Sequence, residues 1–558
     1  MNQNPKYKKI TCIILIITAI SLILTGLIVN SLIKKANSNL SKHWFFEQSI
    51  TTGQPVLLKD AFILSNADGK LLFLYDYKTY EVDGNLPETY FGVANIQVDG
   101  TKISKISIKP EMIEDVLVSY TENTLSLKNE THSELIRNEN LPIYKIKEEQ
   151  VTQAEWNELI IGVSKISCIM DNGEVSAILI KEEVTPSDIR VLIKNGNSIF
   201  YPELYVYQAA TGTLVDVNAA LAANATNILE ISDAQGLLLC DSVGQALESA
   251  YEGIFRIIKT EQGLVLVNEV PMETYLKYVI PSEMQINFGH EALKAQAVCA
   301  RTFAYSQMKN QSYAMYGANL DDSTSFQVYH NNTRYPETDA AVDETVGEII
   351  SCNGQLITCY YCSTSPGVTN DMSSWENTNP AYIAMNGFEK INNLNLQNTV
   401  DFSNYMNLDC ESFDKSSPYY RWKAVLDLSE IKENSYGKLK NMEIKERNAA
   451  GFVTNLELTY ENDVVNYKNE NTIRNILGNY LMEIILNDES IRTGMSMIPS
   501  ACFEIVELSE EKAVLRGGGF GHGIGMSQYG AKAMAEAGYT YKDIINYYYA
   551  NVVVKTLE

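Results

Sequence analysis

The sequence predicts an α+β fold in which strand-rich domains carry a few helices and one transmembrane helix precedes them. Strand patterns dominate residues 44–268, and helical patterns concentrate at about 289–309, 527–537 and 540–549. Because strands and helices are segregated and do not alternate regularly, an α+β class fits better than an α/β class. The chain has 558 residues, of which 45% are hydrophobic, enough for about three domains with cores of their own.

The N-terminus has the pattern of an uncleaved signal anchor. A basic tail at residues 1–9 precedes an uncharged apolar run at 10–33, which Lys34 and Lys35 close. Such a run matches the roughly 20 residues that a helix needs to cross a bilayer, and it is longer than the apolar part of a secretory signal. We therefore expect a single-pass protein of the cell membrane, with its long C-terminal region outside the cytoplasm.

Two regions follow the anchor. Residues 44–185 read as a β-rich accessory domain, because apolar runs are separated by turn signals such as Asp99-Gly100 and Asp171-Asn172-Gly173. This region contains no catalytic constellation, and its role is not indicated. Residues 189–558 contain further strands, the three predicted helices and all the motifs that carry chemistry.

The charge balance excludes one large class of partners. The chain has 44 basic and 69 acidic residues and a net charge of -25, whereas a nucleic-acid binder has a basic footprint. The 34 tyrosines suit a sugar-binding surface, although half-buried positions in strands explain most of them.

Glu283 is the strongest candidate for acid–base chemistry. It lies between Ile280 and Met284 behind a Pro-Ser turn, where its carboxyl is easy to desolvate. Desolvation raises a carboxyl pKa and keeps the group a proton donor near neutrality, as cleavage of a glycosidic bond requires. The alternative interpretation is that Glu283 only caps a helix.

The predicted helix at 289–309 carries a stripe of small residues and a cationic face. Lys294 and Arg301 are seven positions apart and share that face, so Arg301 could bind an acidic or amide group and tune Glu283. An ordinary solvated Lys/Arg face is the alternative. The stripe for close packing consists of Leu293, Ala297, Ala300 and Ala304.

A glycine-rich segment at 516–531 is the second candidate. Its glycines permit positive φ and close approach of the backbone to a ligand, and His522 between two of them is expected to be exposed in a cleft. Ser527 is a plausible N-cap for a helix that ends near Gly538. A phosphate-binding loop does not fit, because no Lys-Ser/Thr follows the glycines.

The cysteines do not predict a metal site. Cys359 and Cys362 have the spacing of a zinc knuckle, but they follow a hairpin through Asn353-Gly354, and residues three apart on a strand point to opposite faces. The adjacent Ser363-Thr364-Ser365 has no Gly-x-Ser-x-Gly elbow, so a serine hydrolase is disfavoured. We assign no metal ligands and no cofactor.

Taken together and in this order, the motifs resemble those of the SpoIID/LytB family of bacterial cell-wall proteins, over about 189–556. The resemblance rests on Val270-Pro271-Met272-Glu273-Thr274-Tyr275-Leu276, Ser282-Glu283-Met284, Glu291-Ala292-Leu293-Lys294-Ala295-Gln296-Ala297 through Ala300-Arg301-Thr302, and Gly518-Gly519-Phe520-Gly521-His522-Gly523-Ile524-Gly525-Met526-Ser527-Gln528-Tyr529-Gly530-Ala531.

The resemblance implies a membrane-anchored lytic transglycosylase that cuts peptidoglycan glycan strands after a partner amidase has removed their stem peptides, in engulfment during sporulation. It places the catalytic glutamate on Glu283, a required arginine on Arg301, and a required Tyr/Lys pair on Tyr419 and Arg421. The expected substrate-binding residues are Arg301, Tyr419, Arg421, His522 and Gln528. The implied partners are glycan strands, a SpoIIP-like cell-wall amidase and a membrane partner.

Two departures from the family pattern and two rival functions follow. Family members commonly have His-Ser-x-x-Gly-Gly where this chain has Cys362-Ser363-Thr364-Ser365-Pro366-Gly367, and this chain is longer than the sporulation protein. LytB-like members are described as modifiers of amidases, so a non-enzymatic glycan binder is the first alternative. A zinc hydrolase that uses His330, Cys359 and Cys362 is the second.

Overall fold

The computed structural model describes most of the chain beyond the predicted anchor. The predicted basic tail at 1–9 and anchor at 10–33 lie outside the described residues. Within the described part, no helix has the length and apolarity needed to cross a membrane. The described residues are 43–557, apart from 68, 85–89, 129–133, 149, 182–184, 224–226, 248, 330–332, 376–378, 388–390, 392–393, 409–410 and 430–435.

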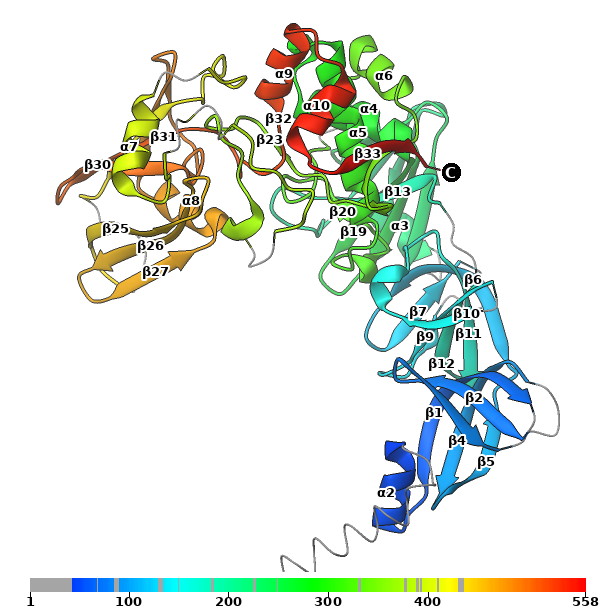
Figure 1. The fold of residues 1–558 in the computed structure, drawn as a ribbon. Helices are drawn as coiled ribbons and strands as arrows, with labels where there is room; N and C mark the ends of the chain where they lie inside the picture. Colours follow the sequence, from blue (N-terminus) through cyan, green and yellow to red (C-terminus); the bar gives the residue numbers. More distant parts are fainter. Residues whose placement is uncertain are drawn as a thin grey trace, which may run out of the picture. The chain divides into compact units, whose positions relative to one another are not determined.

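The predicted α+β class is confirmed for this part of the chain, which is rich in strands and contains nine α-helices. The residues divide into two compact units, one up to Val184 and one from Thr185. Figure 1 labels many of the elements of both units.

The first unit contains a five-stranded antiparallel sheet in the order β3-β2-β1-β4-β5. Helix α2 packs on it because Phe45 and Phe46 are buried with the sheet's apolar face. Strand β1 bulges where it pairs with β4, and Asp60 in the bulge has φ 60°. The bounds are α2 Trp44–Thr52, β1 Val56–Ala67, β2 Lys70–Tyr75, β3 Lys78–Asp83, β4 Gly92–Asp99 and β5 Lys102–Ile108.

The same unit contains a seven-stranded sheet in the order β10-β9-β12-β11-β6-β7-β8. The predicted turn at Asp171-Asn172-Gly173 joins β11 to β12, with positive φ at its last two residues. Phe62 and Val93 of the first sheet pack with Tyr144 and Ile169 of the second, so the two sheets share a core. The bounds are β6 Met112–Tyr120, β7 Thr124–Leu127, β8 Leu135–Ile136, β9 Ile143–Lys147, β10 Gln150–Ala154, the 3-10 helix η2 Trp156–Glu158, β11 Lys165–Asp171 and β12 Glu174–Ile180.

The second unit begins with the five-stranded sheet β16-β18-β19-β13-β20 and the three-stranded sheet β15-β14-β17. Strand β19 is central, almost fully buried, and runs directly into α4. The bounds are β13 Asp188–Ile193, β14 Tyr205–Gln208, β15 Thr213–Asp216, α3 Val217–Ala223, β16 Ile228–Ser232, β17 Leu237–Cys240, β18 Ile254–Lys259, β19 Leu264–Pro271 and β20 Leu320–Asp321.

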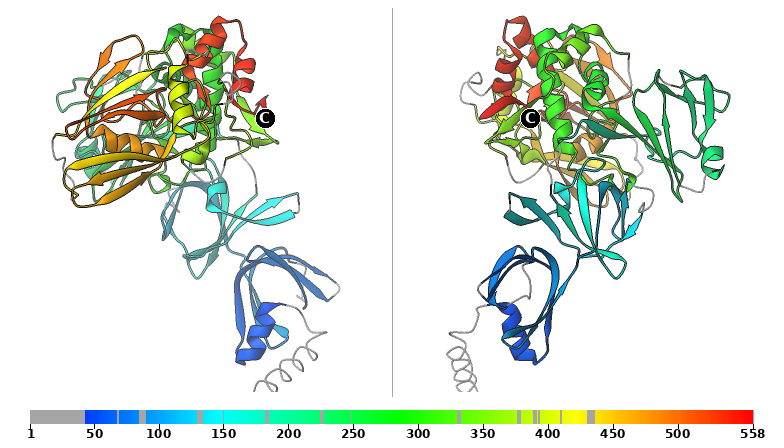
Figure 2. Two further views of the ribbon diagram at one scale, coloured as in Figure 1. Left: turned by 60° about the vertical axis from the view of Figure 1, so that its left-hand side comes forward. Right: turned by 90° about the vertical axis from the view of Figure 1, so that its right-hand side faces the viewer.

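A cluster of helices follows, with α5 at its centre. Helix α5 contacts α4, α6, α9 and α10, and the views of Figures 1 and 2 agree that α9 and α10 lie beside it. The predicted small-residue stripe of α5 is almost completely buried, which permits this close packing. The bounds are α4 Met272–Glu283, η3 Ile286–Phe288, α5 His290–Gln307, η4 Ala314–Tyr316, α6 Pro336–Asp343, α9 Gln528–Glu536 and α10 Tyr541–Tyr548.

Four further sheets complete the unit: β22-β21-β33, the parallel pair β23-β32, β29-β28-β24-β31-β30, and β25-β26-β27. Helix α8 and the last two sheets enclose one core that includes Trp422, Leu456 and Leu515. The bounds are β21 Glu348–Cys352, β22 Gln355–Leu356, β23 Tyr361–Cys362, η5 Met372–Ser374, α7 Thr399–Asn407, β24 Trp422–Asp427, β25 Leu439–Arg447, β26 Val453–Tyr460, β27 Val464–Lys468, α8 Glu470–Gly478, β28 Leu481–Leu486, β29 Ile491–Arg492, β30 Phe503–Leu508, β31 Lys512–Gly517, β32 Met526–Ser527 and β33 Val552–Thr556.

Candidate active site

Glu283 is the last residue of α4, where the sequence had suggested a turn. Residues Met272, Leu276 and Val279 are buried along one side of this helix, which gives the segment a packing reason to be helical. Pro281 lies inside the last turn, where it removes one backbone donor and helps the helix to end. The expectation of a Pro-Ser turn before Glu283 is therefore wrong, because tertiary packing stabilises the helix through the proline.

The Glu283 carboxyl is held by hydrogen-bond donors from three distant segments. The backbone N–H of Val328 donates to Oε1 at 2.8 Å, and the side chains of Gln528 and Tyr361 lie near the carboxyl, where they favour its charged form. Burial, the largest influence, raises the pKa of Glu283 to about 7, and these three donors oppose that rise. Glu283 is nevertheless half-buried, so part of the residue reaches solvent.

The parallel pairing of β23 with β32 delivers two of these donors. Tyr361 is opposite Met526 in the register, and Gln528 follows two residues later as the first residue of α9. The side chain of Gln528 is buried and also donates to Gln296 Oε1 at 3.5 Å. The glycine-rich segment is thus brought to Glu283 as expected, but through Gln528 and not through the glycines.

A polar chain lies behind Tyr361. The Gln327 side-chain amide donates from Nε2 to the Tyr361 hydroxyl at 3.0 Å and to the Ala300 carbonyl at 3.2 Å. Its Oε1 accepts from the Tyr275 hydroxyl at 3.1 Å. Gln327, Val328 and Tyr361 were not predicted from the sequence; the available signal was the pair of tyrosines between the two cysteines in Cys359-Tyr360-Tyr361-Cys362.

Arg301 is placed differently from the prediction. Its side chain is fully buried, and it donates to Glu273 from Nε at 2.8 Å and from Nη2 at 2.6 Å. Its other contacts are the carbonyls of Glu348 at 3.2 Å and Val342 at 3.3 Å. Because every contact is internal, Arg301 joins α4 to α5 and presents no surface to a substrate, which corrects the expected clamp.

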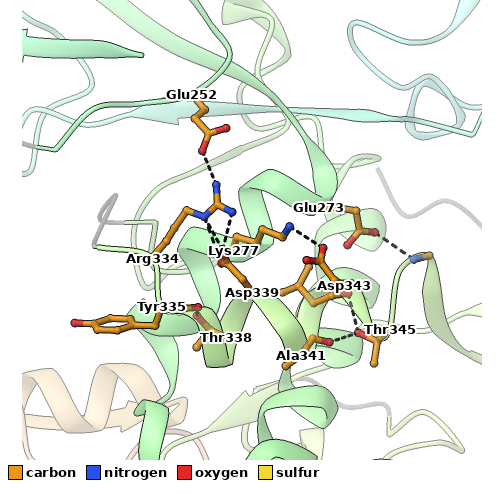
Figure 3. Close-up of polar contacts among 12 residues, drawn as sticks. Glu252, Glu273, Lys277, Arg334, Tyr335, Thr338, Asp339, Ala341, Asp343 and Thr345 are labelled. Atoms are coloured by element: carbon orange, nitrogen blue, oxygen red, sulfur yellow. Dashed lines mark hydrogen bonds and ion pairs between the residues drawn. The ribbon is translucent and has the colours of Figure 1, made fainter. Parts of the chain in front are cut away.

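The same face of α4 is tied to the α6 region by charged contacts (Figure 3). The Gly347 N–H donates to Glu273 at 3.2 Å, and Lys277 forms an ion pair with Asp343 at 2.6 Å. Arg334 bridges Glu252 at 2.7 Å and Asp339 at 2.6 Å. The contacts of Glu273 and Lys277 fix the helix whose last residue is Glu283, and Arg334 joins α6 to Glu252.

The glycines at 519, 521, 523 and 525 all have positive φ, as predicted. Their close neighbours are protein atoms, however. A Cβ at Gly525 would lie 2.0 Å from the Tyr360 carbonyl oxygen, and one at Gly523 would lie 2.5 Å from the Phe452 ring. The segment is therefore glycine-rich because it packs tightly against its own chain, not because a ligand approaches it.

The predicted cap of α9 is confirmed and has a second partner. Ser527 is the N-cap and accepts from the Gly530 N–H, and its hydroxyl also donates to Asp414. The Asp414 carboxylate further accepts from the Ser365 N–H at 2.9 Å and hydroxyl at 2.8 Å. Ser365, which follows β23, and Ser527 thus hold the buried Asp414 carboxylate, whose pKa is raised by its burial.

His522 is half-buried and is held by the protein. Its Nδ1 accepts from the Ile524 N–H at 3.0 Å, its ring also bonds to the Tyr361 backbone, and it packs on Trp375 with centroids 4.9 Å apart. Burial lowers the pKa of His522 to about 4, so the ring is neutral near pH 7. The predicted exposure in a cleft stays a prediction, and in the structure the histidine fixes the backbone of Tyr361.

Tyr419 and Arg421 lie along the other end of the glycine-rich segment. Tyr419 stacks on Phe520 with centroids 4.5 Å apart and an interplanar angle of 18°, and both residues are half-buried. Arg421 donates from Nη1 to the carbonyls of Pro366 at 2.7 Å and Tyr420 at 2.9 Å. Tyr419 thus offers an aromatic surface, whereas Arg421 holds the backbone at Pro366.

The two cysteines of the zinc-knuckle spacing point to different surroundings. The Cys359 thiol hydrogen-bonds with the thiol of Cys299 on α5, whereas Cys362 is buried in β23. His330 lies outside the described residues. In the described part of the chain, no group of three or more His, Cys, Asp or Glu side chains is arranged to hold a metal ion.

The fold and this centre define an α+β protein with a desolvated glutamate surrounded by hydrogen-bond donors. A family model described as stage II sporulation protein matches residues 260–351, which include Glu283, Arg301 and Val328. The chain is 30% identical over 300 residues to stage II sporulation protein D of Bacillus subtilis (strain 168), a match that covers 51% of this chain and 74% of that protein. The chain therefore belongs to the SpoIID family, and the resemblance seen in the sequence is confirmed.

Two further relatives are similar over stretches of comparable length. The chain is 28% identical over 303 residues to stage II sporulation protein D of Bacillus amyloliquefaciens, covering 51% of this chain and 74% of the relative. It is 32% identical over 293 residues to the amidase enhancer of Bacillus subtilis (strain 168), covering 49% of this chain but 39% of that protein. The match thus spans well under half of the amidase enhancer.

Proposed function

We propose that the chain is a peptidoglycan lytic transglycosylase that cleaves denuded glycan strands, with Glu283 as general acid and general base. The observation that carries the proposal is the half-buried carboxyl with a pKa of about 7. At neutral pH such a group is present in both protonation states, as a residue that first gives and then takes a proton requires. Among the described residues, the groups that shift the pKa of Glu283 are Val328, Gln528 and Tyr361, and they include neither a second carboxylate nor a cation.

A single carboxyl is sufficient for this reaction. Glu283 protonates the glycosidic oxygen that leaves C1 of the muramic acid residue, and the resulting carboxylate takes the proton from the 6-hydroxyl of the same sugar. That oxygen attacks C1 and closes a 1,6-anhydro ring. Because the nucleophile belongs to the substrate, neither an activated water nor the second carboxylate of ordinary glycosidases is needed.

The expected substrate-binding set is reduced by the contacts described above. Tyr419, stacked on Phe520, supplies a half-buried aromatic surface of the kind on which sugar rings pack. Arg301, Arg421, His522 and Gln528 are engaged by the protein, so we assign them to the positioning of the site and not to direct contact with the glycan.

The cellular setting is also part of the proposal. The apolar run at 10–33 would anchor the chain in the cell membrane with the catalytic unit outside the cytoplasm. The relatives named as sporulation proteins support a role in sporulation, and the relative named amidase enhancer supports association with an amidase. Engulfment, and a SpoIIP-like amidase that prepares the denuded strand, are what the family resemblance implies.

The decisive test is mass analysis of the products from stripped glycan strands treated with purified residues 36–558. The expected products carry 1,6-anhydro-muramic ends, and Glu283→Gln should abolish them because the amide cannot donate the proton. The matched control is Glu337→Gln, since Glu337 is exposed on α6. Near-full production of anhydro ends by Glu283→Gln would remove Glu283 from the role.

A second function is favoured by the similarity to the amidase enhancer. In that case the same unit would bind glycan and stimulate a cell-wall amidase without cleaving the strand itself. Retention of stripped glycan with no anhydro ends, together with faster release of stem peptides by an added amidase, would support this alternative and refute the transglycosylase.

A further inference from the structure

The surroundings of Glu283 impose a direction on its proton. A carboxylate offers about four lone-pair sites to hydrogen-bond donors. The Val328 N–H occupies one at 2.8 Å, and the side chains of Gln528 and Tyr361 lie near the carboxyl as donors for two more. A backbone N–H cannot accept a proton in return, so this side of the carboxyl always receives a hydrogen bond.

Tyr361 has the same restriction, because Gln327 determines where its hydroxyl proton points. The Ala300 carbonyl can only accept, so the amide nitrogen of Gln327 must face it, and the second N–H of that nitrogen then points at the Tyr361 oxygen. The Tyr275 hydroxyl donates to the amide oxygen and holds the same orientation from the other side. With its oxygen receiving a hydrogen bond from Gln327, Tyr361 turns its own O–H towards Glu283.

We propose that Gln327 and Tyr361 are positioning residues that, with Val328 and Gln528, leave Glu283 one site for its own proton, on the solvent-facing side of the carboxyl. This inference rests on the proposed function, because that is the side from which a glycosidic oxygen would approach. The protonated carboxyl of Glu283 therefore does not donate its hydrogen bond to an acceptor inside the protein. Buried polar chains with every group satisfied are well suited to fixing such an orientation.

The first test is Tyr361→Phe in the full chain, without glycan. The protonation of Glu283 is followed by infrared spectroscopy, as the difference between the spectrum of each protein and that of the same protein carrying Glu283→Gln. Loss of one donor to the carboxylate should raise the pKa of Glu283 by about one pH unit. The matched control is Tyr329→Phe, because Tyr329 is a fully buried tyrosine that donates to Asn268 at 3.0 Å and not to Glu283. The control should leave the Glu283 titration unchanged.

The second readout is the pH profile of anhydro-end formation from stripped glycan. In Tyr361→Phe, the limb that falls with rising pH should move up by about one unit, and kcat should fall about tenfold with KM unchanged, because the proton can now occupy the wrong side. Gln327→Met, which frees the Tyr361 hydroxyl to turn away, should shift the profile in the same direction. Retained helical circular dichroism would show that each variant is folded.

The two proposals fail in different ways. If the wild-type chain makes no anhydro ends, the proposed function fails, while the infrared titration still reports on the hydrogen-bond chain. If the wild type is active but Tyr361→Phe titrates and turns over like Tyr329→Phe, the positioning role of Tyr361 and Gln327 is overturned.

Discussion

The ion pair of Arg301 with Glu273 gives a prediction that separates a structural arginine from a substrate clamp. The guanidinium is fully buried on α5, and its two shortest contacts are with the Glu273 carboxylate at the start of α4. Glu273→Gln keeps the shape of the side chain but removes its charge. The variant therefore leaves a buried cation without an anionic partner.

The expected loss of stability follows from the asymmetry of burial. Removal of one partner from a buried ion pair typically costs about 3–5 kcal/mol, because the remaining charge is uncompensated. The reverse change, Arg301→Met, leaves a carboxylate whose side chain is 28% exposed and which still accepts from the Gly347 N–H. Since water can reach that carboxylate, we expect a smaller loss of about 1–3 kcal/mol.

Urea denaturation, followed by tyrosine and tryptophan fluorescence, measures both variants and the double variant Glu273→Gln/Arg301→Met. The double variant should be more stable than Glu273→Gln alone, because it no longer buries a charge. Glycan retention per folded molecule should equal that of the wild type. If Arg301→Met has the midpoint of the wild type but loses retention of stripped glycan, Arg301 contacts substrate and the reasoning from its burial is refuted.

Three further predictions concern pH, backbone and capping. The pKa of Glu283 is raised from 4.5 to about 7 in the folded chain, which therefore binds this proton more tightly than the unfolded chain. The free energy of unfolding should fall by about 3 kcal/mol as the pH rises between these two pKa values. Urea midpoints measured across this pH range should show the fall, and Glu283→Gln should abolish it. Gly525→Ala should cost more than 3 kcal/mol or prevent folding, because its Cβ would lie 2.0 Å from a carbonyl oxygen, whereas Gly538→Ala, at φ 86° with open space around it, should cost about 1 kcal/mol; equal melting temperatures would contradict this. Ser527→Ala should cost about 2–3 kcal/mol, since it removes a helix cap and a donor to a buried carboxylate, against about 1 kcal/mol for the exposed cap Thr540→Ala, and denaturation midpoints that rank in the opposite order would count against the buried contact.

Local signals in the sequence predicted local structure well. The helix at 289–309, the hairpin through Asn353-Gly354 and the Ser527 cap are all present, because each depends on the chemistry of a few neighbouring residues. The same approach missed α4, since Pro281 is a breaker by its own chemistry and only burial of the helix against the rest of the unit overrides it.

The candidate site was predictable in its centre but not in its surroundings. Glu283 stands out because apolar neighbours in sequence suggest desolvation, and the structure shows a raised pKa from burial. The partners of Arg301 and the donors Tyr361 and Val328 come from segments far apart in the chain. Periodicity and spacing carry no information on such contacts. Arg301 has no anionic partner close to it in the sequence, so the sequence predicts that it binds a ligand, whereas in the fold it pairs with Glu273.

The pairing of β23 with β32 also affects the time at which the centre can form. The strands of this pair are separated in sequence by everything from η5 to β31, and Gln528 follows the second strand. A ribosome must therefore make almost the whole second unit before the carboxyl acquires its neighbours. Under the proposed function, an unfinished or truncated copy would be unable to cut glycan, because an incomplete polypeptide lacks the segment that closes the centre.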